Sequence, residues 1–276
     1  MWQVALGSAT MAAIPVPGAP ACNRIDDVGP TMLADGRIAF QRRCTPGARG
    51  PNTFDTTLTA LNNDGSLTVL ANLGGLPFVP RQVAWSASAT EGILWGGSRI
   101  CDGLLAVDRS GVKALDVEIN ASGHAFNLKD FVSNNCTDTG NAELPAWSKD
   151  GHTIAFLASG DAVGKSDAAR LDASYSLFTM DSQAWIPRQL LSNIVQPMGL
   201  AWSPDGTKVA FSATVGGNPG TWILNAGSGR LTRVAQTNHL DVAWSPDGSQ
   251  LAALENETQA PADPNIHIVF DVGSIK

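Results

Sequence analysis

The sequence has few charged residues and only a small excess of acidic ones. Lys, Arg, Asp and Glu together make up 16% of the 276 residues, and the formal net charge is −7. The chain contains no cluster of Lys and Arg interleaved with aromatic residues, so it offers no electrostatic footprint for a phosphate backbone. We therefore expect no nucleic-acid partner.

Apolar runs long enough to cross a bilayer are also missing. Residues 1–23 carry no charged side chain, but glycines and prolines interrupt this segment at positions 7, 15, 17, 18 and 20. A spanning helix needs about 20 consecutive apolar residues, and a signal peptide begins with basic residues. We therefore expect no membrane span in this chain, and we expect any export signal to lie upstream of residue 1.

Cysteine is scarce and never closely paired. Cys22, Cys44, Cys101 and Cys136 lack the CxxC spacing of zinc ribbons and redox motifs, which argues against a metal site built from sulfur. Their even number and their grouping in sequence, 22 with 44 and 101 with 136, would allow two local disulfides in an oxidising compartment. Four buried free thiols are the alternative, because unpaired cysteine is often buried.

Glycine, proline and a repeated hexapeptide are plentiful. The 28 Gly and 16 Pro suit many short strands joined by tight turns. Ala-Trp-Ser-Pro-Asp-Gly occupies residues 201–206 and 243–248, and Ala-Trp-Ser-Lys-Asp-Gly occupies residues 146–151. Such internal similarity predicts an array of structurally similar units.

Two further copies of the hexapeptide are degenerate. One begins at residues 84–86 as Ala-Trp-Ser and reaches Glu91-Gly92 after a two-residue insertion. The other occupies residues 32–36 and has Met32 at the Trp position. Because the spacing between copies varies while the motif is kept, we expect five units with constant strands and variable loops.

The hexapeptide has the composition of a turn between two strands. Pro holds φ at roughly −65° at the second turn position, Asp tolerates the third, and Gly accepts the turn exit. Short apolar segments flank it, such as 199–202 before and 208–211 after one copy. We expect the tryptophans to occupy equivalent buried sites that pack one unit against the next. The structural repeat positions are Trp85, Trp147, Trp202, Trp244, Asp150, Gly151, Asp205, Gly206, Asp247 and Gly248.

A second hairpin follows the first in each unit. In the first unit, the apolar segments 58–61 and 67–70 flank the turn at 63–65. Two hairpins per unit give the four-stranded antiparallel blade of a β-propeller, which is an all-β fold. We therefore predict a propeller domain over residues 29–276 with five recognisable blades, preceded by a linker or closing segment over residues 1–28.

The Trp-Ser-Pro-Asp-Gly-x-x-(Val/Leu)-Ala pattern resembles the WD-like PD repeat of TolB-type β-propellers, which also occurs in the non-catalytic propellers of prolyl oligopeptidase relatives. The resemblance covers about residues 29–276 and is specific for fold rather than function. Relatives usually have six to eight blades. Either residues 2–14 close the ring, by pairing with the last blade or by building part of a sixth, or the chain is cut from a larger propeller.

Two long insertions interrupt the regular units, and loops of this kind often carry function. They span Asn120–Asn141 and Ser159–Ser174. The aspartates of the second insertion do not follow the spacing of an EF-hand, so we interpret it as a solvated loop, with a calcium site as a minor alternative.

Catalytic signatures are absent from the sequence. The chain has neither Gly-x-Ser-x-Gly nor HExxH, and its four histidines, at positions 124, 152, 239 and 267, are dispersed. We expect no catalytic, cofactor-binding or metal-binding residues, and we interpret the chain as a monomeric binding module with a protein or peptide partner. The resemblance to TolB implies a periplasmic or extracellular location. The alternative is a lactonase-like or glycan-acting propeller enzyme whose channel gathers one residue per blade.

Overall fold

The computed structural model describes residues 2–5, 10–13, 17–18, 22–33, 35–46, 55–73, 79–86, 88, 90–97, 102–108, 110–129, 140–161, 172–254 and 267–273. Every helix or strand assigned within these ranges is a β-strand, and the strands pair antiparallel. The all-β fold expected from the sequence is therefore confirmed. The described residues include no helix that could span a bilayer.

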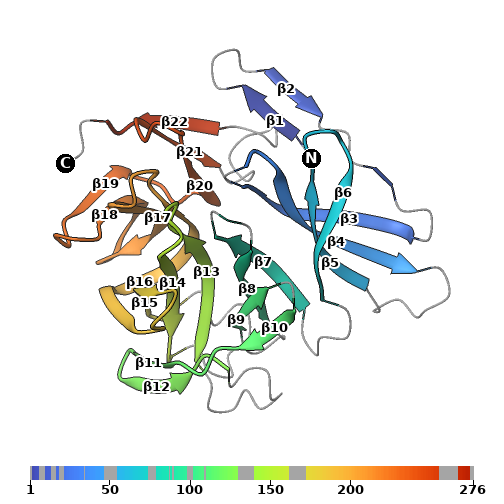
Figure 1. Ribbon diagram of the computed structural model, residues 1–276. Helices are drawn as coiled ribbons and strands as arrows, with labels where there is room; N and C mark the ends of the chain where they lie inside the picture. Colours follow the sequence, from blue (N-terminus) through green and yellow to red (C-terminus); the bar gives the residue numbers. More distant parts are fainter. Residues whose placement is uncertain are drawn as a thin grey trace.

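The first two blades are separate four-stranded sheets in which consecutive strands lie side by side (Figure 1). This order, with the strand before the hexapeptide turn at one edge, is that of a propeller blade. The first blade comprises β3 (Cys22–Met32), β4 (Ile38–Pro46), β5 (Asp55–Leu61) and β6 (Leu67–Asn72), and the second comprises β7 (Val79–Trp85), β8 (Glu91–Gly97), β9 (Asp102–Asp108) and β10 (Gly111–Ala114).

The third and fourth blades share one long strand, β16. Its first half pairs with β15 and its second half with β17. Asn193 and Gln196 have positive φ angles of 59° and 52°, a conformation that is uncommon outside glycine and that bends the strand between its two halves. The seven strands of this sheet are β13 (Asn141–Trp147), β14 (Thr153–Ser159), β15 (Tyr175–Asp181), β16 (Pro187–Trp202), β17 (Lys208–Val215), β18 (Asn218–Asn225) and β19 (Leu231–Ala235).

The fifth blade has three strands in the described part of the chain: β20 (Asp241–Trp244), β21 (Gln250–Leu254) and β22 (His267–Asp271). The strands that precede the hexapeptide turns contact one another in the order β3, β7, β13, β16 and β20. We call them the inner strands, because this order arranges the blades around a common centre (Figure 1).

The N-terminal segment forms a hairpin of its own. β1 (Trp2–Ala5) pairs with β2 (Thr10–Ala13), and this two-stranded sheet is separate from the β20–β22 sheet. In Figure 1 it lies between β22 and the first blade. The expected pairing with the last blade is therefore not formed among the described strands, whereas a partial extra sheet is. Local pairing is favoured because a short loop costs less closure entropy than joining distant parts of the chain.

The first blade begins earlier than the expected boundary after residue 28, because β3 starts at Cys22. Two contacts tie this stretch to β4. Arg42 donates two hydrogen bonds to the Asp27 carboxylate, both at 2.8 Å. Cys22 and Cys44 form a disulfide. The second pair expected from the sequence, Cys101 and Cys136, lies outside the described residues.

The hydrogen bonds of the second-blade turn show how the degenerate repeat at residues 84–92 aligns with the other copies. The N–H of Ser86 donates to the carbonyl of Glu91 at 2.9 Å, and the N–H of Ser203 donates to the carbonyl of Lys208 at the same distance. Glu91 therefore matches Lys208, and the expected two-residue insertion was wrong. Ser88, whose hydroxyl oxygen lies 3.1 Å from that of Ser86, takes the place of the turn aspartate.

Part of the first long insertion forms a hairpin, β11 (Glu118–Ala121) and β12 (His124–Asn127). Its turn residues Ser122 and Gly123 have φ angles of 56° and 78°, which are the two positive values of a type I′ turn. Ile119 and Phe126 pack in one apolar cluster with residues of β8, β9, β14 and β15. The hairpin therefore adds to the core between the second and third blades.

Candidate functional site

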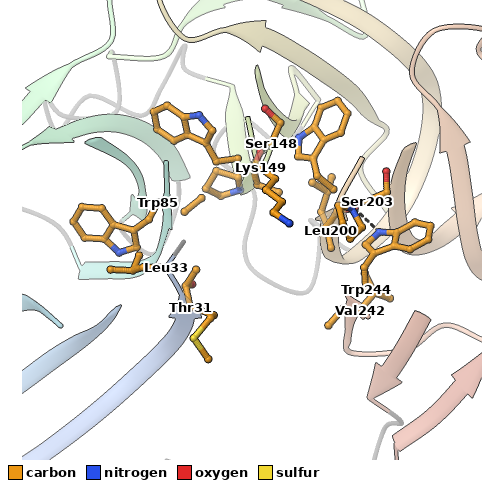
Figure 2. A pocket seen from close by; sticks show the side chains of 18 of the residues that line it. Thr31, Leu33, Trp85, Ser148, Lys149, Leu200, Ser203, Val242 and Trp244 are labelled. Carbon is orange, nitrogen blue, oxygen red and sulfur yellow. Dashed lines mark hydrogen bonds between the residues drawn. The ribbon is translucent and has the colours of Figure 1, made fainter. Parts of the chain in front are cut away.

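The ends of the inner strands surround a hollow of about 630 Å³ (Figure 2). Each inner strand contributes the residue at the hexapeptide Trp position: Met32, Trp85, Trp147, Trp202 and Trp244. The volume lies within the range of ligand pockets in proteins. We call this hollow the funnel, and it is the candidate functional site.

The indoles also connect neighbouring blades. The Nε1–H of Trp202 donates to the carbonyl of Ala146 at 3.2 Å, and the Nε1–H of Trp244 donates to the carbonyl of Ala201 at the same distance. In both cases the acceptor directly precedes the Trp of the previous blade. Trp202 and Trp244 are therefore both packing residues and hydrogen-bond donors to the neighbouring inner strand. The indole Nε1 of Trp147 is buried without a hydrogen-bond partner among the described residues.

The four tryptophans are equivalent in position but unequal in burial. Trp85 is 7% exposed, whereas Trp147, Trp202 and Trp244 are half-buried. The uniformly buried sites expected from the sequence are therefore not observed. At the same position in the first blade, Met32 is 65% exposed.

The serines and aspartates of the hexapeptide hold the turns at the funnel rim. Ser203 Oγ donates to the Asp205 carboxylate at 2.6 Å and accepts from the N–H of Lys208 at 2.9 Å. Donation from the serine hydroxyl is the leading cause that lowers the pKa of the turn aspartates, that of Asp247 to about 2. The equivalent pairs are Ser148 with Asp150 and Ser245 with Asp247.

The shared turn geometry explains the glycines of the repeat as well. Gly151, Gly206 and Gly248 have φ angles of 78°, 70° and 72°, in the left-handed region that favours glycine. The repeat positions Asp150, Asp205 and Asp247, together with these glycines, therefore have an internal structural role in the turns.

Two charged residues stand among the described residues that line the funnel, Lys149 and Asp241. Asp241 accepts a hydrogen bond from the N–H of Val242 at 2.8 Å. Desolvation raises the pKa of the Asp241 carboxyl above its ordinary value, against the smaller lowering effect of that hydrogen bond. The rest of the described lining is aromatic, aliphatic or uncharged polar, so the funnel offers contact surface and one charge of each sign.

Sequence reasoning missed Lys149 and Asp241 as funnel residues. A signal for Lys149 was present, because it occupies the hexapeptide position that Pro204 and Pro246 occupy in the fourth and fifth blades, and those prolines also line the funnel. Asp241 and Gln82 lie on inner strands outside the repeated motif. No pattern within the sequence distinguishes them from other polar strand residues.

His239 is a buried histidine with a packing role. His239 is 1% exposed, its N–H donates to Ser212 Oγ at 2.6 Å, and its Nδ1 lies 2.7 Å from Thr221 Oγ1. It thereby connects the start of the fifth blade to the fourth. Within the described ranges, no three His, Cys, Asp or Glu side chains are grouped to hold a metal ion.

The blades and the successive contacts of their inner strands define a β-propeller fold, and solved structures show the same fold. The chain is similar to TolB from Acinetobacter baumannii (TM-score 0.58, 14% identity, 90% of this chain and 52% of that one) and to a putative TolB from Agrobacterium tumefaciens (0.55, 13%, 83% and 69%). It is also similar to a chain of a nidogen/laminin complex (0.59, 12%, 97% and 84%). The chain thus spans about half the length of the first of these proteins.

These likenesses establish the fold alone, because the identities are low. No protein-family model matches the chain, and no curated protein sequence matches it. The funnel must therefore be interpreted from its own chemistry.

Proposed function

We propose that this chain is a non-enzymatic binding module that takes a segment of a partner protein into the funnel. The observation that carries the proposal is the ring of Met32, Trp85, Trp147, Trp202 and Trp244 around an open hollow. Partly exposed Trp supplies a large contact area at low entropic cost, and Trp is enriched among the residues that dominate protein interfaces. Because the turn serines and aspartates already satisfy one another, the ring side chains are the groups left for a partner.

The funnel lining indicates the kind of segment that fits. Leu200 and Val242 add aliphatic surface to the tryptophans, and Gln82 adds an amide. Lys149 and Asp241 add one positive and one negative charge. The proposed ligand is therefore a protein segment rich in apolar or aromatic side chains and low in net charge.

The proposal includes a TolB-like role, as a monomer, in the periplasm or outside the cell. Two observations support it. The Cys22–Cys44 disulfide is of a kind that persists in oxidising compartments. The similarity in fold to two TolB structures is the second support.

Peptide selection tests the proposal, because it can find a binding segment of any sequence. Random linear peptides displayed on phage are selected on the full chain, and a synthetic peptide from the enriched pool is bound to it. Amide hydrogen exchange of the complex is then measured. We expect slower exchange in residues 79–86, 140–148, 196–204 and 240–246, which contain the funnel ends of four inner strands. Protection confined to outer strands such as β10 and β19 would contradict the proposal.

A further inference from the structure

One wall of the funnel carries a carboxylate at a defined distance from the tryptophans. The inner-strand residues three positions before the ring residues are Gly29, Gln82, Leu144, Gly199 and Asp241, and Asp241 is the charged one among them. It also lines the funnel. Because a strand rises about 3.3 Å per residue, Asp241 lies roughly 10 Å along β20 from Trp244, on the side away from the turns.

The neighbouring inner strand makes room for this carboxylate. Gly199 on β16 is the equivalent residue of the fourth blade, and a Cβ there would lie 2.6 Å from Asp241 Cα and 2.8 Å from its Oδ1. The carboxylate therefore rests against the backbone of β16. In Figure 2, Leu200, Val242 and Trp244 lie on the same side of the funnel, so the surrounding wall is apolar and aromatic.

The described residues provide no ion pair for Asp241. Its carboxylate accepts one hydrogen bond, from the N–H of Val242, and no charged side chain contributes to the shift of its pKa. Asp241 is exposed to the open funnel, but the walls displace much of the water around it, and this desolvation raises the pKa of its carboxyl. The other funnel charge, Lys149, is exposed in the third-blade turn. A cation brought close to Asp241 would therefore stabilise the ionised carboxylate.

We propose that the protein segment bound in the funnel places a basic side chain against Asp241, an inference that rests on the proposed function. Arginine and lysine bury their aliphatic stems along apolar surface while the charged head reaches a polar group, which suits a stem that passes the tryptophans. Arginine is the better fit, because its guanidinium stacks on aromatic faces and donates two hydrogen bonds to one carboxylate.

Parallel peptide selections test whether Asp241 sets this preference. Random linear peptides displayed on phage are selected on the wild type, on Asp241→Asn and on Asp271→Asn. We expect wild-type binders to carry arginine or lysine at one fixed position among apolar residues, and binders of Asp241→Asn to lack it. Asp271→Asn is the matched control, because Asp271 is also exposed, accepts a backbone N–H from Gly273 at 3.2 Å and lies outside the described funnel lining. It should select the same peptides as the wild type.

Calorimetric titration of a synthetic wild-type binder then measures the pair itself. The basic residue is replaced by its uncharged counterpart, citrulline for arginine or acetyl-lysine for lysine. We expect this change to weaken binding to the wild type roughly 10- to 100-fold, as loss of a charge-assisted hydrogen bond does, and to weaken binding to Asp241→Asn less than about 3-fold. The comparison on the wild type remains valid if Asp241→Asn fails to fold.

Three results would overturn the inference while leaving the proposed function intact. The first is a set of binders that protect the funnel ends of the inner strands from hydrogen exchange but share no basic position. The second is equal affinity of the charged and uncharged peptides for the wild type. The third is an equal loss on the wild type and on Asp241→Asn, which would assign the cation to another group. If no peptide protects the funnel, both the proposed function and the inference are wrong, so the two failures are distinguishable.

Discussion

The indole Nε1–H of Trp244 lies 3.2 Å from the carbonyl oxygen of Ala201 and donates a hydrogen bond across the boundary between the fourth and fifth blades. Trp202 makes the same bond to Ala146 one blade earlier. Phe could fill a similar volume, but its ring carries no hydrogen-bond donor. The bond therefore gives the indole a specific role at two of the four repeat tryptophans, Trp202 and Trp244.

Replacement of Trp202 by Phe should remove this bond while keeping most of the packing. We expect the free energy of unfolding to fall by about 1 kcal/mol, the usual net value of a hydrogen bond, as measured by urea denaturation. Trp185→Phe is the matched control, because Trp185 is also half-buried and its indole donates to no described residue. Equal losses in the two variants would show that the indole donor has no special part in the assembly of the blades.

Local chemistry determined how much of this fold could be predicted. The turns at Ser203–Lys208 and Ser245–Gln250 depend on a few adjacent residues, so the repeated hexapeptide predicted both hairpins and the blade built on them. The repeat in the second blade was misaligned because Ser88 stands where the other turns have aspartate. A comparison of residue identities does not show that serine and aspartate make the equivalent hydrogen bond at this position.

The site was harder to predict than the blades, because its residues meet only through tertiary structure. The funnel charges Lys149 and Asp241 come from different blades. A lysine in a turn and an aspartate on a strand are ordinary surface residues, so nothing in the sequence marks these two as neighbours.

Gly160→Ala should displace the β11–β12 hairpin. The added methyl carbon would lie 2.5 Å from Cβ of His124 and 2.6 Å from the carbonyl oxygen of Ala121, and neither can move without the hairpin backbone. We expect a loss of about 1–3 kcal/mol in the free energy of unfolding, as for other overpacked sites. Gly227→Ala is the control, since its closest contact would be 3.6 Å from Asn225 Oδ1. A neutral Gly160→Ala would show that the hairpin is not seated on the third blade as described.

Acid should weaken the fifth-blade turn in a defined range of pH. The pKa of Asp247 is lowered from 3.8 to about 2, chiefly by donation from the Ser245 hydroxyl, so the ionised form is favoured in the folded state. Its contribution to stability is fully present above pH 3.8 and is lost as the pH falls toward 2. Thermal unfolding across this range should therefore show a smaller loss of stability for Asp247→Ala than for the wild type. Parallel curves for the two proteins would contradict this role.

The disulfides should be detectable by intact mass after alkylation under denaturing conditions. We expect Cys22 and Cys44 to resist alkylation without reductant, and we make the same prediction for Cys101 and Cys136. The double replacement Cys22→Ser/Cys44→Ser should cost about 3 kcal/mol, because the bond closes a loop across a sequence separation of 22 residues. Four alkylated thiols in unreduced protein would contradict both bonds and remove a main support for export.

The affinity of a funnel-selected peptide for two matched charge variants tests the central claim most directly. Met32→Glu places a carboxylate among the tryptophans that line the funnel, at a side chain that is 65% exposed. Ile186→Glu makes a similar change at a residue that is 68% exposed and lies outside the described funnel lining. Calorimetric titration should show at least a roughly tenfold weaker affinity for Met32→Glu, because a charge must be desolvated against apolar groups. Ile186→Glu should bind as the wild type does. Equal affinities for all three proteins would contradict the assignment of the funnel as the binding site.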